Sequence, residues 1–98
     1  MNTVAFCDLD RVLSLTEAMH HAASEGRWDD LTELDAERDP VLRAGTMRPA
    51  PETLESLKSI MLMDNLIKDL VSAARDETAL ALDAGRRVRK AVAAYTSF

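Results

Sequence analysis

A long stretch without glycine or proline sets the strongest limit on how this chain can fold. Residues 52–84 contain neither residue type, and apolar side chains recur through them at helical spacing. These apolar residues are Leu54, Leu57, Ile60, Met61, Ile67, Leu70, Val71, Ala74 and Ala81. Because proline is favoured in a first helical turn, Pro51 is a suitable start. We therefore predict one helix over residues 51–84, roughly 50 Å long at 1.5 Å per residue.

Glycine and proline also divide the rest of the chain. Apolar residues at helical spacing predict a first helix over residues 8–25, and Gly26 is well placed just past its end. A second helix is predicted from residue 27 or 28 to Gly45. It should kink or break at Pro40, because proline lacks a backbone donor and disfavours helical geometry in the residue before it. Residues 46–51 (TMRPAP) form a linker.

The two shorter helices cannot cover the whole of the third. Each spans roughly 27 Å, and their short connection predicts an antiparallel hairpin. The hairpin can cover residues 51–70 and leaves residues 71–82 uncovered. The predicted fold is all-α: an antiparallel helical hairpin packed on a long third helix, with a short C-terminal helical segment. This three- to four-helix bundle forms a single domain over residues 1–98, in which residues 86–98 fold back, stay mobile or continue the third helix beyond Gly85.

Composition limits the class of protein. Apolar residues make up 47% of the 98 residues but include only four aromatics, a mixture that suits helices better than strands. The single cysteine, Cys7, excludes an intramolecular disulfide. No apolar run reaches the 18 or more residues of a membrane span, and the first residues do not resemble a signal peptide. These features predict a cytoplasmic protein.

Charge is unevenly distributed along the chain. All 17 acidic residues lie between Asp8 and Asp83; with eight basic residues in the same part, the chain up to Gly85 has a net charge of −9. Residues 86–98 have a net charge of +4 and contain no acid. We interpret this segment as a regulatory tail that can fold back, meet an acidic partner or remain solvated. Its candidate residues are Arg86, Arg87, Arg89, Lys90 and Tyr95.

No group of residues predicts catalysis. Glu17, His20, His21 and Glu25 could share a metal, but adjacent histidines on a helix point about 100° apart and an isolated set lacks the ligands of a structural site. We interpret them as surface residues and predict neither metal nor cofactor. Cys7 lacks a catalytic partner motif, and Asp64 is interpreted as a polar residue that fixes helix register or as a boundary position. The chain is predicted not to be an enzyme.

Several segments together resemble the FliT family of flagellar export chaperones. The first is Gly26-Arg27-Trp28-Asp29-Asp30-Leu31, followed by Glu37-Arg38. A proline-containing linker then precedes Ile60-Met61-Leu62-Met63-Asp64-Asn65, with Ile67 and Leu70 beyond it. The segment Arg89-Lys90-Ala91-Val92-Ala93-Ala94-Tyr95 resembles the family's segment that closes on Ala-Tyr.

The resemblance implies a cytoplasmic chaperone for the flagellar filament-cap protein. Such proteins bind the cap protein's C-terminal region and deliver it to the type III export apparatus. In some bacteria they also restrain the master transcriptional activator of flagellar genes. The family's fold is a helical bundle with a long third helix, and its C-terminal helix can cover the partner-binding surface. Family members usually continue past Ala-Tyr, so autoinhibition is expected to be weaker or absent here, or the chain is shortened relative to the family.

Three functional hypotheses follow. The first is the export chaperone, which would bind its partner through apolar residues of the second and third helices. These candidates are Val41, Leu42, Leu57, Ile60, Met61, Ile67 and Val71. The second is a transcriptional regulator that contacts DNA through residues 86–90, although the net charge of −5 and the absence of interleaved aromatics argue against it. The third is a homodimeric bundle formed through the uncovered end of the third helix.

Overall fold

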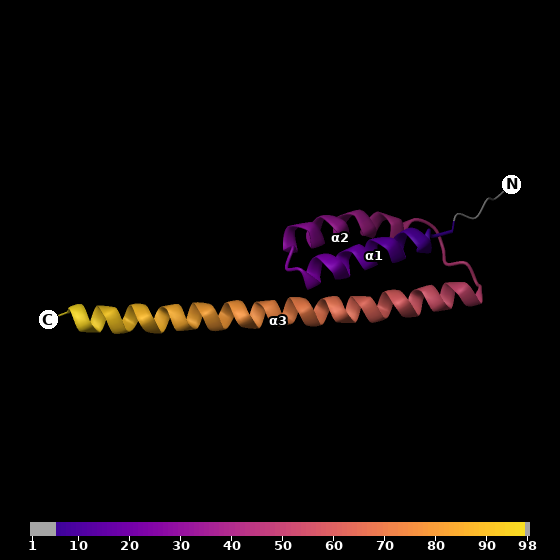
Figure 1. The fold of residues 1–98 in the computed structure, drawn as a ribbon. Helices are drawn as coiled ribbons and strands as arrows, with labels where there is room; N and C mark the ends of the chain where they lie inside the picture. Colours follow the sequence, from indigo (N-terminus) through magenta and orange to yellow (C-terminus); the bar gives the residue numbers. More distant parts are fainter. Residues whose placement is uncertain (1–5, 98) are drawn as a thin grey trace.

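The computed structural model describes residues 6–97, which form three α-helices. Helix α1 spans Leu9–Ser24, α2 spans Trp28–Arg43 and α3 spans Pro51–Thr96. Figure 1 shows α1 and α2 as an antiparallel hairpin beside the first part of α3, with α1 running in the same direction as α3. The predicted all-α fold, a hairpin packed on a long third helix, is confirmed.

The helix ends follow from local chemistry. The Asp8 side chain caps α1 by accepting a hydrogen bond from the backbone N–H of Arg11 at 3.1 Å. Gly26 and Gly45 follow α1 and α2 with φ angles of 71° and 82°, a left-handed conformation that costs glycine little. Pro51 occupies the first turn of α3, where no intrahelical donor is needed.

Two expectations about helix continuity are settled by the structure. Of the kink or break predicted at Pro40, the break is excluded, because α2 continues through Pro40 to Arg43. At Gly85, where the sequence left alternatives open, α3 continues without interruption to Thr96. The C-terminal segment is therefore the last part of α3 and does not fold back on the hairpin.

The core lies along a seam between α1 and α3. The buried residues Val12, Thr16, Met19 and Ala23 recur in α1 at alternating spacings of four and three. Ile60 and Ile67 of α3 are buried against them, and Leu31, Leu34, Leu70 and Val71 complete the apolar cluster. This alternation is the pattern by which two helices pack side by side in a coiled coil.

The N-terminal segment ties the hairpin to the linker. The Cys7 N–H donates to the carbonyl of Thr46 at 2.9 Å, and Phe6 pairs with Thr46 in a single parallel β-bridge. The Cys7 thiol donates to the carbonyl of Val41 at 3.3 Å. These contacts hold the last turn of α2 near the start of α1.

The molecule is elongated because α3 extends well past the hairpin. The described residues measure 83 × 23 × 16 Å. After Ala74, every described residue of α3 except the half-buried Gly85 is exposed. The predicted shortfall in cover is therefore present, but it begins at residue 75 and not at residue 71, because Val71 packs against the core, and it extends to the end of the helix.

Candidate functional site

A groove separates α2 from α3. Helix α1 packs against both, whereas no Cα atom of α2 lies within 8 Å of one in α3 among the described residues. Met19 of α1 forms part of the groove lining, between Leu31 and Thr32 of α2 and Ile67 of α3. The groove continues to the hairpin tip, where Trp28, Leu31, Thr32, Val71, Ala74, Arg75 and Thr78 line it. Helical grooves of this kind accept the apolar face of another helix.

One arginine side chain bridges the groove. The Arg38 guanidinium of α2 donates through Nη1 to Asp64 Oδ1 of α3 at 2.7 Å and to Thr16 Oγ1 of α1 at 3.1 Å. Arg38 is only 12% exposed, Asp64 is 33% exposed and Thr16 is fully buried. We call these three residues the Arg38 clasp. Because it joins all three helices, it fixes the position of α2 relative to α3.

The structure does not gather the predicted partner-binding residues on one free surface. Ile60 and Ile67 are buried beneath the hairpin, so contact through them would require the hairpin to move away. Met61 is 63% exposed, whereas Val71 is half-buried and lines the groove at the hairpin tip. The remaining three predicted residues, Val41, Leu42 and Leu57, are half-buried.

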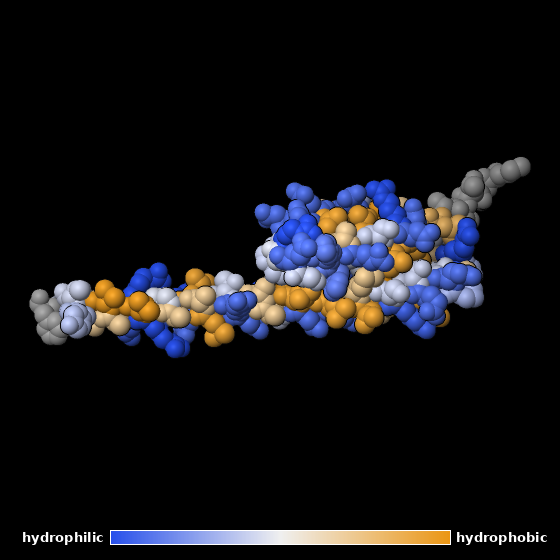
Figure 2. Space-filling view, in the orientation of Figure 1, coloured by the Kyte–Doolittle hydropathy of each residue, from blue (hydrophilic) through white to orange (hydrophobic). Residues whose placement is uncertain are grey.

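Residues 86–97, the described part of the predicted regulatory tail, are all exposed. Arg86, Arg87, Arg89, Lys90 and Tyr95 all lie on the free end of α3, and Tyr95 is 83% exposed. Arg87 forms an ion pair with Asp83 one turn earlier. Figure 2 shows that this end of α3 carries apolar as well as charged residues on its surface.

The predicted site does not include several large apolar residues that the structure shows exposed on α3. They are Leu54, Leu62, Leu66, Leu80, Leu82, Val88 and Val92. For Val88 and Val92 a signal was present, because the alternation of three and four that passes through Ile60 and Ile67 continues to both. The prediction left open whether the third helix continues beyond Gly85, and so it did not follow that pattern to its end.

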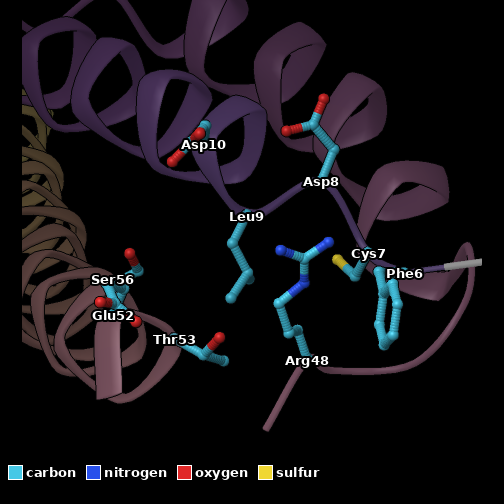
Figure 3. Close-up of a pocket in the computed structure, with 9 residues that line it drawn as sticks. All are labelled: Phe6, Cys7, Asp8, Leu9, Asp10, Arg48, Glu52, Thr53 and Ser56. Carbon is cyan, nitrogen blue, oxygen red and sulfur yellow. The ribbon is translucent and has the colours of Figure 1, made fainter. Parts of the chain in front are cut away.

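A second hollow lies where the N-terminal segment meets the linker (Figure 3). Arg48 lies over the ring of Phe6 at 5.0 Å, and Asp8, Asp10 and Glu52 also line the hollow. Within residues 6–97, no three His, Cys, Asp or Glu side chains are placed to hold a metal ion together. His21 instead contacts Glu25 at 2.9 Å on the exposed side of α1.

The turn between α1 and α2 is a charged network. The Arg27 guanidinium donates to Asp30 Oδ2 and to Glu25 Oε2, each at 2.7 Å. These two hydrogen bonds raise the pKa of Arg27, with Asp30 the larger cause. The turn coincides with the Gly26–Leu31 segment that carried the family resemblance, so that segment fixes the hairpin tip where the groove ends.

No helix in the part of the chain that the structure describes has both the length and the apolarity to cross a bilayer.

The chain was compared with protein families, curated proteins and solved structures, and the family comparison agrees with this resemblance. Neither a curated protein nor a solved structure matches the chain. The family model described as flagellar protein FliT matches residues 7–97, almost the whole sequence. The chain therefore belongs to the FliT family of flagellar proteins.

Proposed function

We propose that this chain is a cytoplasmic, non-enzymatic export chaperone. It binds the C-terminal region of the flagellar filament-cap protein, protects it and delivers it to the type III export apparatus. Through protein binding it also regulates flagellar gene expression, by restraining the master transcriptional activator. The family membership supports this role, and the observation that carries it is the groove between α2 and α3, open to solvent and lined by apolar residues of all three helices.

The test is retention of the filament-cap protein by the purified chain. We expect the cap protein to be retained, and a cap protein lacking its C-terminal region to pass through. Thr32→Arg should reduce retention because Thr32 lines the groove both beside Met19 and at the hairpin tip. Ala36→Arg, which adds the same charge outside the groove-lining residues of α2, should have little effect.

A deletion strain provides the complementary test in the cell. If the proposal is correct, cap secretion and motility fall when the gene is removed and return when it is supplied in trans. Normal secretion and motility would contradict the proposal. A shift of duplex DNA at low salt that disappears on Arg87→Ala plus Arg89→Ala would favour the DNA-binding hypothesis instead.

A further inference from the structure

The seam of α3 continues beyond the hairpin. Its residues recur at alternating spacings of four and three from Leu57 through Ile60, Asp64, Ile67, Val71 and Ala74. The same alternation continues through Thr78, Ala81, Gly85, Val88, Val92 and Tyr95, which we call the open seam. Helix α1 covers the first part and ends at Ser24, whereas nothing within residues 6–97 covers the second part. The open seam is therefore a coiled-coil surface that lacks its second helix.

Gly85 is an independent sign that a second helix approaches the open seam. A glycine inside a helix costs about 1 kcal/mol relative to alanine. No neighbouring atom of this chain explains it, because a Cβ at Gly85 would meet nothing within 4 Å, and its φ angle is not positive. Glycine and alanine along a seam permit a close approach of another backbone. The two seam residues that precede Gly85, Thr78 and Ala81, are also small.

The edges of the open seam differ in charge. Arg75 and Arg89 lie on one edge with Leu82 between them, and Glu77, Ala84 and Ala91 lie on the other. Both arginines are exposed, and neither forms an ion pair with another described residue. Arg87, on the outer side of the helix, is by contrast paired with Asp83. The arginine edge is thus positioned to meet carboxylates of another molecule.

A second copy of this chain does not fit the open seam. In an antiparallel pair, equal edges face each other, so Arg75 and Arg89 would oppose Arg89 and Arg75 of the other copy, and like charges at such positions destabilise a coiled coil. In a parallel pair, the second α3 would run into the space that the hairpin already fills beside the first part of α3.

We propose that the open seam binds an amphipathic helix of the exported client, with acidic residues along the edge that faces Arg75 and Arg89. This helix takes the place along α3 that α1 occupies nearer the N-terminal end of α3, and one of its ends meets the hollow at the hairpin tip. The inference rests on the proposed chaperone function and specifies the chemistry of its client.

The first test uses two synthetic 21-residue amphipathic peptides with the same apolar seam. One carries Glu at the positions that flank its seam and the other carries Lys. The Glu peptide should bind the full chain at least about tenfold more tightly, because opposite charges at helix edges select partners. Equal affinity for the two peptides, or no binding of either, would overturn the inference.

Adjacent residues of equal charge give a matched control. Arg89→Glu should weaken binding of the Glu peptide about tenfold, whereas Lys90→Glu, on the outer side of α3, should change it less than about twofold. Gly85→Leu should abolish binding, and Ala79→Leu, outside the seam, should not. Ala79 is exposed, and a Cβ at Gly85 would meet no neighbouring atom. Helix content measured by circular dichroism should therefore remain unchanged in both leucine variants.

The same variants separate this inference from the proposed function. If the filament-cap protein binds the wild-type chain, Arg89→Glu and Gly85→Leu equally well, the open seam is not its site, although the chaperone function stands. If the Glu peptide binds and the cap protein does not, the chaperone function fails instead. A dimer in sedimentation that Gly85→Leu dissociates would assign the open seam to a second copy and overturn the inference.

Discussion

The guanidinium of Arg38 contacts all three helices, and its surroundings make it sensitive to the loss of a partner. Its Nε is buried without a hydrogen-bond partner within the described residues. The hydrogen bonds to Asp64 and Thr16 therefore offset most of the cost of burying the guanidinium. Asp64→Ala should lower the free energy of unfolding by roughly 1–3 kcal/mol, because it leaves the largely buried guanidinium with the exposed Asp35, at 3.5 Å, as its remaining ion-pair partner. Urea denaturation of the two proteins measures the difference.

Replacement of the arginine, the other partner of the ion pair, is the control for this prediction. Arg38→Met removes the buried cation and leaves Asp64, which is one-third exposed and can be hydrated. It should therefore cost less than Asp64→Ala. If Arg38→Met proves the more damaging change, the aliphatic packing of Arg38 matters more than its charge, and the interpretation of the clasp is wrong.

Two glycines should respond to alanine in opposite directions. Gly26 has a φ of 71°, so Gly26→Ala should destabilise the protein by about 1–2 kcal/mol in thermal or urea unfolding. Gly85 is helical and its Cβ position is open, so Gly85→Ala should stabilise the local helix by about 0.5–1 kcal/mol. The gain should be visible as slower amide exchange near residue 85. Faster exchange there would contradict the prediction, because it would show that Gly85 makes the helix of the isolated chain more stable than alanine does.

At the scale of elements, α3 is one helix with two unequal parts. The part between Ile60 and Val71 packs on the hairpin, whereas the part beyond Thr78 is exposed on every side. Local opening needs less free energy where fewer apolar contacts are lost. Amide exchange should therefore be slowest between residues 60 and 71 and much faster beyond residue 78. Uniform protection along α3 would contradict this division, and binding of a client helix should slow exchange beyond residue 78.

The helix ends could be predicted from the sequence because single residues determine them. Gly26, Gly45 and Pro51 each impose a local backbone geometry that needs no information about distant contacts. The continuation of α2 through Pro40 could not be predicted, for the opposite reason. Pro40 lies one turn from the end of α2, and the last turn of that helix is held by the Cys7 thiol, which is 34 positions from Val41. The local sequence pattern around Pro40 cannot reveal a contact between residues so far apart in the chain.

The candidate site was predictable only in part, for a similar reason. Unequal helix lengths correctly placed an uncovered surface on the third helix. Apolar character alone, however, does not distinguish Ile60 and Ile67, which the hairpin buries, from residues left free on the same helix. The Arg38 clasp could not be predicted either, since its partners Thr16 and Asp64 lie 22 and 26 positions away.

At the scale of the whole molecule, stability and binding occupy different parts of the chain. The buried residues lie between Val12 and Ile67, and the open seam contributes nothing to that core. Deleting residues 86–98 should therefore change the free energy of unfolding by less than about 0.5 kcal/mol, as for other surface changes. The urea m-value should fall only slightly, because little buried area is lost. Urea denaturation followed by circular dichroism measures both quantities.

The deletion of residues 86–98 should remove binding of a client helix without affecting the core. It takes away Val88, Arg89, Val92 and Tyr95, so the shortened chain should lose affinity for a Glu-flanked helix while its fold persists. Lys90→Glu in the full chain is the comparison that keeps the seam intact. A stability loss above about 2 kcal/mol would show that the end of α3 supports the fold, since losses of that size need a buried contact or a similar mechanism. No such loss, together with lost affinity for the Glu-flanked helix, would show that the exposed end of this 83 Å molecule serves binding and not folding.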